Sequence, residues 1–278
     1  MTYERYRHKN GQEQSFAPRS LLRPCALFFG AAIAVAGVER AGAVDWYTGE
    51  KTSGPDYAPN VVLDASDSLT SKNSDFGAVA LTAALEGNLA QDGFRSRVEG
   101  IGGVYQYFTT LPPVTPGGIG ATQKVFARQE DVGVLGGYGW TSRDWSAAVY
   151  GGVEVINTTL SFNDPGNASK GLRIGAKVAG EFYGNPTTNT MLSGYASFTS
   201  STREYYSRFK AGYRIAGNIY IGPEFFALGN QFYSEYRAGV HLTGVTIGHL
   251  SLGVSGGASS NKITGSGGYG IVDARLGF

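Results

Sequence analysis

The stretch "GLRIGAKVAGEF", residues 171–182, changes character at every second residue. Leu172 and Ile174 fall on one face of an extended strand, whereas Arg173 and Lys177 fall on the other. Successive side chains of a strand point to opposite sides, so this period of two indicates a strand that separates an apolar medium from a polar one. A soluble β-sandwich gives the same local pattern, and the choice between sandwich and membrane barrel needs the rest of the chain.

The two-residue period recurs along the chain, and after residue 44 there is no apolar run long enough for a transmembrane helix. It is clear in "YYSRFKAGYRI" (205–215) and in "YRAGVHLTG" (236–244). The composition agrees, because 42 glycines, 17 tyrosines and 15 phenylalanines suit tightly turning β structure better than helices. The segments predicted as strands are residues 45–50, 76–89, 94–108, 124–140, 145–160, 170–183, 190–199, 204–215, 218–228, 235–245, 248–257 and 268–278.

The connections between these twelve segments alternate in length. Short ones, such as "AQDG" and "TSRD", follow every second strand, and "SSTR" (200–203) is short where a long one is expected. An even number of strands, with longer loops at one end and tight turns at the other, is typical of outer-membrane β-barrels. The longer connections are residues 51–75, 109–123, 161–169, 229–234 and 258–267.

We therefore predict an all-β fold, an antiparallel transmembrane β-barrel with short periplasmic turns and longer extracellular loops. A closed barrel is also the only sheet that satisfies all its backbone groups in lipid. Twelve strands keep both chain ends in the periplasm. Ten to fourteen strands are compatible with the pattern, because segment 45–50 is short and 51–75 has room for a further strand.

The C-terminal stretch "YGIVDARLGF" (269–278) carries a further sign of a barrel. It ends on Phe278, and apolar residues stand at two-residue steps before it. Outer-membrane barrels commonly end on such an aromatic residue, which the barrel assembly machinery reads. Asp273 and Arg275 then face the lumen, where they can pair or meet water.

The N-terminus has the order of a secretory signal. Arg19 and Arg23 precede the apolar run "CALFFGAAIAVAGV", which is too short to span a bilayer as a helix and is followed by the small residues of "AGA" (41–43). We expect residues 1–43 to be a cleaved signal peptide and 44–278 to be an outer-membrane β-barrel. The single cysteine, Cys25, would leave with the signal, so the mature chain needs no disulfide.

No enzyme site, metal site or cofactor is predicted. The pair His249 and Ser251 is similar to the His-x-Ser pair of outer-membrane lipid A deacylases, but the acid expected downstream is missing from "SNKITGSG" (260–267). The loop "FNDPGN" (162–167) is better explained as a turn than as a cation site. A formal net charge of +1 gives no indication of nucleic-acid binding.

Polar side chains on the inner faces are the candidate functional residues. They can pair with one another and only hold the barrel together, or they can form a path or binding surface for hydroxyl-rich or anionic material. Tyrosines among them suit stacking on sugar rings. The residues predicted to face the lumen or a polysaccharide are Arg173, Lys177, Glu181, Tyr206, Arg208, Lys210, Arg214, Tyr220, Glu224, Arg237, His241, Asp273 and Arg275.

The stretch "YIGPEFFALGN" (220–230) raises a local question, because it places a proline and a carboxylate in an apolar strand. We expect Ile221 and Phe225 to face lipid and Glu224 to face the lumen. Pro223 has no N–H to donate, so a bulge or a missing ladder bond is expected there. The candidate partners of Glu224 are Arg208, Lys210, Arg214 and Arg237.

Four stretches together resemble the BcsS family, the cellulose biosynthesis protein of alphaproteobacterial cellulose operons. They are "LEGNLAQDGFRSRVEGIGGVYQY", "NDPGNASKGLRIGAKVAGEFYGNPTTNTM", "YIGPEFFALGNQFYSEYRAGVHLTG" and "SGGYG", and they fall in this order between residues 85 and 270. The resemblance implies a non-enzymatic outer-membrane barrel that assists export, anchoring or organisation of the β-glucan at the cell surface. It implies cellulose and other cellulose-secretion components as partners, and it carries no catalytic residues.

Two other functions compete with this one. A general small-solute porin is typically a wider barrel of roughly 16–18 strands, for which the 278 − 43 = 235 residues that follow the expected signal are short. An outer-membrane lipid hydrolase would need the acid that the His249 region lacks.

Overall fold

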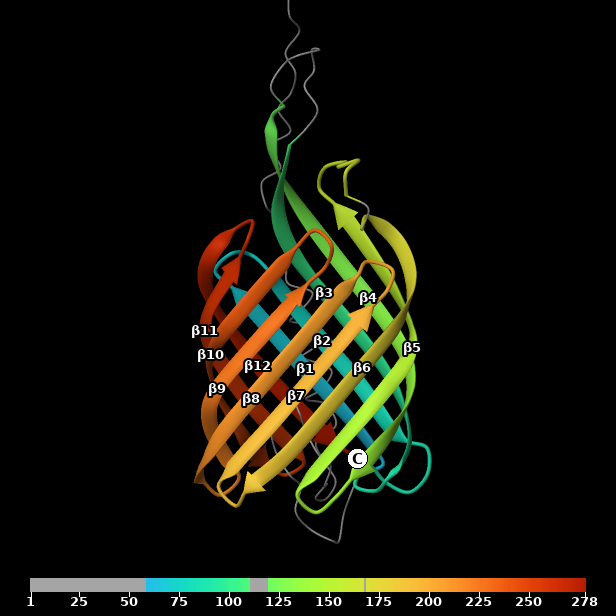
Figure 1. Cartoon of the computed structure of the whole chain (residues 1–278), viewed down its shortest axis with the longest axis vertical. Helices are drawn as coiled ribbons and strands as arrows, with labels where there is room; N and C mark the ends of the chain where they lie inside the picture. Colours follow the sequence, from blue (N-terminus) through green and yellow to red (C-terminus); the bar gives the residue numbers. More distant parts are fainter. Residues whose placement is uncertain (1–58, 111–119, 168) are drawn as a thin grey trace, which may run out of the picture.

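The computed structural model describes residues 59–110, 120–167 and 169–278. Twelve antiparallel strands follow one another around a closed barrel, and β1 pairs with β12 to complete it (Figure 1). The predicted fold class and strand number are confirmed. The strands are β1 (Val61–Thr70), β2 (Asp75–Ala84), β3 (Gly93–Thr110), β4 (Thr122–Thr141), β5 (Trp145–Leu160), β6 (Gly171–Thr187), β7 (Thr190–Thr199), β8 (Glu204–Ala216), β9 (Ile219–Gly229), β10 (Ser234–Ile247), β11 (Leu250–Asn261) and β12 (Gly265–Gly277).

The first strand is where the prediction was wrong. β1 lies inside the stretch 51–75, which was predicted to be a connection, and it pairs with both β2 and β12. The face opposite to lumen-lining Ser66 carries Val61, Leu63, Ala65 and Leu69, so the alternation is present in β1. Asp67 on this face and the buried Val62 on the inner face interrupt the pattern. Segment 45–50, predicted as the first strand, lies outside the described residues, as does the expected signal peptide.

The two ends of the barrel differ as expected for an outer-membrane protein. At the same end as the C-terminus, the connections after β6, β8 and β10 have two residues each and the one after β4 has three (Figure 1). The connection after β2, predicted to be the short turn "AQDG", is the exception at this end, because it spans residues 85–92. The connection 161–170 lies at the opposite end, where the long strands β3 and β4 project furthest. The short turns therefore mark the periplasmic end, and the projecting end is extracellular.

An apolar belt surrounds the outside of the barrel. On β5 the outward positions from Trp145 to Val155 carry only apolar residues, and Val149 between them is 52% exposed. Ten residue steps at about 3.3 Å each, tilted by about 40°, give a height of roughly 25 Å. This matches the hydrocarbon band of an outer-membrane barrel, so the exposed apolar side chains face lipid.

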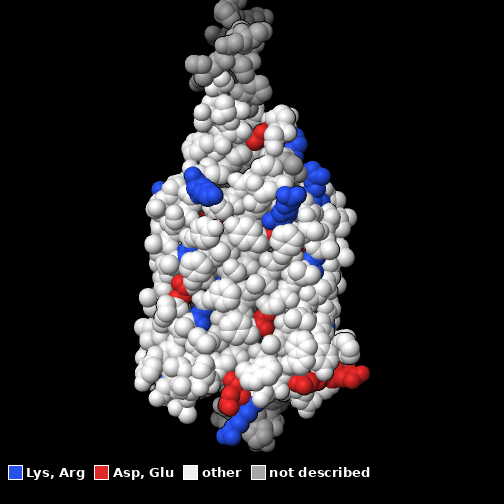
Figure 2. Space-filling view, viewed as in Figure 1, with Lys and Arg blue, Asp and Glu red and all other residues white. Residues whose placement is uncertain are grey.

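Aromatic residues mark the periplasmic edge of this belt. Tyr138 packs against Phe94 and Trp140, with ring centroids 5.2 Å apart in both pairs, and Trp145 follows across the short turn. Such girdles sit at the membrane–water interface. Figure 2 shows a mostly white wall between the ends with a few patches of charged residues, and several Lys and Arg side chains near the extracellular end.

In the part of the chain that the structure describes, no helix is long and apolar enough to cross a membrane.

Candidate functional site

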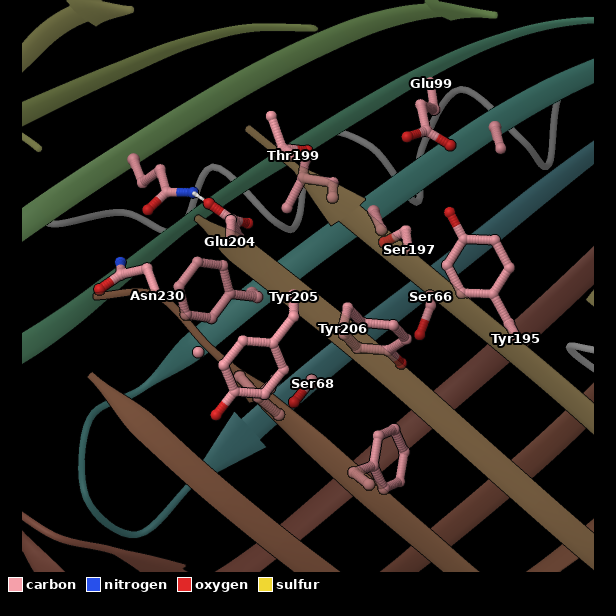
Figure 3. Close-up of a pocket in the computed structure, with 18 of the residues that line it drawn as sticks. Ser66, Ser68, Glu99, Tyr195, Ser197, Thr199, Glu204, Tyr205, Tyr206 and Asn230 are labelled. Carbon is pink, nitrogen blue, oxygen red and sulfur yellow. Dashed lines mark hydrogen bonds between the residues drawn. The ribbon is translucent and has the colours of Figure 1, made fainter. Parts of the chain in front are cut away.

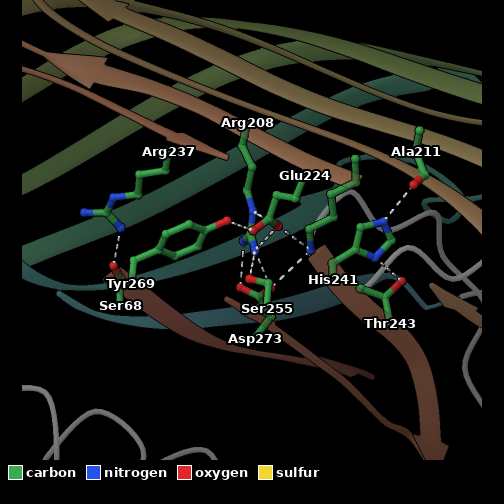
Figure 4. Close-up of polar contacts among 11 residues, drawn as sticks. Ser68, Arg208, Ala211, Glu224, Arg237, His241, Thr243, Ser255, Tyr269 and Asp273 are labelled. Atoms are coloured by element: carbon green, nitrogen blue, oxygen red, sulfur yellow. Dashed lines mark hydrogen bonds and ion pairs between the residues drawn. The ribbon is translucent and has the colours of Figure 1, made fainter. Parts of the chain in front are cut away.

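Two groups of charged side chains cross the lumen, and the first is here named the Arg208 cluster (Figure 4). Arg208 donates from Nη1 and Nη2 to the two carboxylate oxygens of Asp273, at 2.8 Å each. It also donates from Nε and Nη2 to Glu224 Oε2, at 2.9 and 2.7 Å. Lys210 Nζ lies 3.1 Å from Asp273 and 3.9 Å from Glu224. Tyr269 donates to the other oxygen of Glu224 at 3.2 Å.

The Arg208 cluster ties together distant parts of the barrel wall. Arg208 and Lys210 come from β8 and Asp273 from β12, and three strands lie between them. The four charged side chains are at most 2% exposed, and their two positive and two negative charges balance. Buried charges are tolerated when each is paired and hydrogen-bonded, so these residues depend on one another.

His241 of β10 completes a hydrogen bond that Pro223 of β9 leaves open. Pro223 has no N–H to donate. The pairing of β8 with β9 is interrupted there, because no residue pair is formed between Lys210–Glu224 and Tyr213–Ile221. The carbonyl oxygen of Ala211 lies there, and His241 Nε2 lies 3.1 Å from it. Because a carbonyl only accepts, Nε2 carries the proton and donates.

Gly222 makes this arrangement possible. It lies directly opposite His241 in the β9–β10 pair, and a Cβ on Gly222 would stand 2.0 Å from the Ala211 oxygen. Thr243 Oγ1 lies 3.3 Å from Nδ1 of His241 and fixes the ring from its other side. The neighbouring Gly-Pro and His-x-Thr segments are therefore parts of one hydrogen-bonded unit.

The structure answers the question raised by this strand. Ile221 and Phe225 are exposed on the outside, at 40% and 46%, whereas Glu224 is buried inside. A bulge at Pro223 is not what occurs, because the register is the same on both sides of it and shifts only between Arg214 and Ala216. The absent N–H of proline interrupts the ladder without adding a residue to the strand.

The second group of charges is here named the Arg97 cluster. Arg97 Nε lies 3.0 Å from Glu99, and its Nη1 lies 3.0 Å from Glu181 on the far strand β6. Lys177 lies between Glu99 and Glu154 and contacts both, with Nζ 2.5 Å from Glu154 Oε1. The rings of Tyr150 and Tyr195 flank the Arg97 guanidinium, each with its centroid 5.5 Å away.

A cavity of about 130 Å³, here named the chamber, reaches from the Arg97 cluster toward the extracellular end (Figure 3). Asn230 and Tyr233 of the β9–β10 connection line its outer part. Burial, followed by the charge of neighbouring Glu235, raises the pKa of Tyr233 above its usual value, so the phenol remains a hydrogen-bond donor to Glu235. Small hydroxyl side chains line other parts of the chamber: Ser66, Ser68, Ser197 and Thr199.

Aromatic rings form two opposed walls of the chamber. On one side Tyr206 lies between Tyr195 and Phe226, with centroid distances of 5.9 and 6.1 Å. On the other side Tyr105 packs against Phe76 and Tyr233, with centroid distances of 6.4 and 5.6 Å. The chamber therefore offers ring faces together with hydroxyl and amide groups.

The residues predicted to face the lumen lie in three settings. Buried inside are Lys177, Arg208, Lys210, Tyr220, Glu224, Arg237, His241 and Asp273. Partly buried are Glu181, Tyr206, Arg214 and Arg275. Arg173 is the exception, because it is exposed near the start of β6, a strand longer than the roughly 9–11 residues that cross a bilayer.

The structure also shows which predicted partners meet. Of the four candidates for Glu224, Arg208 and Lys210 contact it. Arg214 instead donates to Tyr220 Oη at 2.7 Å. Arg237 binds Glu235 at 2.6 Å and Ser68 at 2.6 Å. Arg275 lies 3.5 Å from Asp64 of the adjacent strand.

Most of the Arg97 cluster was missed. Arg97, Glu99 and Glu154 were not among the candidates, although "FRSRVEG" (94–100) and "VEV" (153–155) alternate clearly. Applying the two-residue period to β3 and β5 would have placed these side chains inside.

The candidate sites for other chemistry have structural explanations. Asp164 accepts from the Gly166 N–H at 3.0 Å and from Tyr107 Oη at 2.9 Å, so it stabilises a turn. His249 lies in the two-residue connection between β10 and β11. Within the described residues, no group of three or more His, Cys, Asp or Glu side chains is arranged to hold a metal ion.

The comparison with protein families decides the assignment. The model of the family "Cellulose biosynthesis protein BcsS" matches residues 70–278, which is most of the chain and includes strands β2 to β12 entirely. The chain belongs to this family. The resemblance expected from the sequence is confirmed, and BcsS membership connects the barrel to cellulose biosynthesis.

Solved structures resemble this BcsS member only at the level of the barrel. The KdgM porin in complex with disordered oligogalacturonate is 10% identical with a TM-score of 0.43, over 78% of this chain and 99% of that chain. LpxR from Salmonella typhimurium is 11% identical with a TM-score of 0.44, over 78% and 100%. The TodX deltaS2S3 mutant monoaromatic hydrocarbon channel is 8% identical with a TM-score of 0.44, over 78% and 89%. No curated protein matches the sequence.

Proposed function

We propose that this BcsS member is a non-enzymatic outer-membrane accessory that anchors or organises cellulose at the cell surface and does not conduct it. The family supports the connection to cellulose. The apolar belt and the aromatic girdle support a place in the outer membrane. The observation that carries the proposal is the pair of ion clusters that cross the lumen.

These clusters are links across the interior and not only contacts between neighbouring strands. Arg97 on β3 reaches Glu181 on β6, and Arg208 on β8 reaches Asp273 on β12. Gln129 on β4 adds a third link, because it donates to Glu204 on β8 at 2.8 Å. A polymer crossing the barrel would have to break these buried, paired charges, which favours anchoring over passage.

Conductance in planar lipid bilayers tests the closed lumen. We expect the purified barrel to insert without stable ohmic channels, because paired side chains occupy its interior. Stable conductance steps that scale with salt concentration would support the competing function, a small-solute channel, and would remove the basis for an anchor.

Deletion of the gene in its native host tests the connection to the polymer. We expect cellulose, measured as cellulase-sensitive glucose, to be altered in amount, texture or attachment, and a plasmid copy to restore it. Unchanged cellulose in all three respects would refute the role in cellulose biosynthesis and leave the barrel without this function.

We also propose that residues 1–43 direct export and are removed. Arg19, Arg23 and the apolar run after them support this. Mass spectrometry of the protein from outer membranes should give a mature N-terminus at or near Ala43–Val44. An N-terminus that retains the apolar run would contradict a cleaved signal.

Phe278 is the proposed contact for the barrel assembly machinery. Its backbone N–H donates to the Val61 carbonyl at 2.9 Å, so it lies at the seam where β12 meets β1. Removing Phe278 should lower the amount of folded barrel in the outer membrane, measured by heat-modifiable migration on gels. A Phe278→Tyr variant, which keeps an aromatic end, should assemble normally.

A further inference from the structure

We propose that the chamber binds a single sugar ring of a neutral β-glucan, such as a chain end, from the extracellular side. This inference rests on the proposed function, because it names the part of the polymer that the barrel would hold. It is drawn from the rings, the charges and the size of the chamber.

The rings supply the apolar part of such a site. Tyr206 is partly exposed and lines the chamber between Tyr195 and Phe226 (Figure 3). Tyr105 and Tyr233 face the chamber from the opposite wall. The flat C–H faces of a pyranose pack well on aromatic rings, and ligand pockets combine such rings with a few placed polar groups.

The charges in the wall favour a neutral ligand over an anionic one. Arg97 and Lys177 are both held by carboxylates of the Arg97 cluster. Arg237, the third cation in the wall, lies 2.6 Å from Glu235. An anion would have to compete with these carboxylates, whereas sugar hydroxyls can exchange hydrogen bonds with the hydroxyl and amide groups of the wall. These groups include Ser66, Ser197, Thr199 and Asn230. Thr199 already donates to Glu154, and Asn230 Oδ1 accepts from two backbone N–H groups, so a sugar would share or replace such bonds.

The volume limits what can enter. The chamber has about 130 Å³, similar to a cavity of about 150 Å³ that takes up benzene. A sugar ring with its hydroxyl groups is larger than benzene, so this volume sets one sugar ring as the upper limit and excludes several consecutive residues of a chain. The Arg97 cluster bounds the chamber on its inner side, and the β9–β10 connection bounds it on the extracellular side. A glucan end from outside the cell would have to pass Tyr233, which is 7% exposed and bonded to Ser74 and Glu235.

Calorimetry on the folded barrel tests this proposal. The protein is held in a detergent without a sugar headgroup and titrated with cellotetraose, with maltotetraose and with an oligogalacturonate of similar length. We expect binding of the β-linked neutral oligomer and weaker or no binding of the anionic one. Absence of heat with cellotetraose, or preference for the acid, would overturn the proposal.

Two variants of β8 provide the matched comparison. Tyr206→Ala removes the central ring of one wall and should weaken cellotetraose binding roughly threefold to tenfold. Tyr213→Ala removes a tyrosine from the lipid face of the same strand, where it is 59% exposed, and should leave binding unchanged. Heat-modifiable migration shows whether each variant is folded. Equal affinity of folded Tyr206→Ala and wild-type protein would also overturn the site.

The outcome separates this site from the proposed function. If deletion of the gene alters cellulose but the purified barrel does not bind cellotetraose, the accessory role stands and the chamber is not its binding site. If the barrel binds cellotetraose but deletion leaves cellulose unchanged, the site stands and the role fails.

Discussion

The Arg208 cluster makes the most direct prediction about stability. Asp273→Asn keeps the size of the side chain but removes a carboxylate that accepts from Arg208 at 2.8 Å twice and from Lys210 at 3.1 Å. It leaves two buried cations against Glu224 alone. Removing one partner of a buried ion pair typically lowers the free energy of unfolding by about 3–5 kcal/mol. We expect a loss of this size, because Asp273 is 0% exposed and water cannot replace the lost charge.

Urea unfolding of the purified barrel in detergent, followed by circular dichroism and by gel migration, measures this loss. Glu130→Gln is the matched control, because Glu130 pairs with Arg128 on the outer face of β4 with both side chains about half exposed, at 51% and 54%. Surface pairs contribute about 1 kcal/mol or less. The control should therefore unfold nearly as wild type does.

A second variant tests the reason for the loss. Arg208→Met combined with Asp273→Asn leaves one cation, Lys210, against one anion, Glu224, so the buried charge is balanced again. This double variant should be more stable than Asp273→Asn alone. The reasoning is refuted if Asp273→Asn lowers the free energy of unfolding by no more than Glu130→Gln does. It is also refuted if the loss in the double variant equals the sum of the losses in the single variants Arg208→Met and Asp273→Asn.

Other substitutions test neighbouring contacts. His241→Ala should lower the free energy of unfolding by about 1–3 kcal/mol, because the Ala211 carbonyl loses its donor; no change in urea midpoint would show that another donor replaces it. Gly222→Ala should cost at least about 2 kcal/mol in the same assay, because the new methyl group meets the Ala211 oxygen. Gly136→Ala, whose new methyl group would have no neighbouring atom within 4 Å, should cost much less, and similar losses for both would contradict the steric reason.

Alternation predicted the strands, because a wall between lipid and a polar lumen imposes a two-residue period, and the connection lengths and the terminal Phe278 then favoured a barrel over a sandwich. It works for β6, where Ile174 and Val178 are exposed outside and Lys177 is buried inside. It was not recognised in β1, where apolar Val62 faces inward and charged Asp67 faces outward, so the period is interrupted twice. The predicted number of twelve agrees with the described strands, although it counted segment 45–50, which lies outside the described residues, and did not count β1.

The candidate site was predictable residue by residue but not as a set of contacts. The sequence indicates that Arg208 and Asp273 face inward, yet their pairing depends on barrel diameter and strand stagger, which no single strand encodes. For the same reason Arg214 could not be separated from Arg208 as a partner of Glu224. The chamber depends on how rings from several strands pack, so it is visible only in three dimensions.

The attachment of cellulose to cells tests the central claim most directly. Three strains of the native host are grown in liquid culture: one with the gene deleted, and two in which a plasmid supplies the wild-type gene or the Tyr213→Ala form. Cellulase-sensitive glucose is then measured separately in washed cells and in the medium. An anchoring barrel predicts that deletion moves cellulose from the cells to the medium and that both plasmid forms reverse this. An unchanged distribution between cells and medium would contradict the anchoring role.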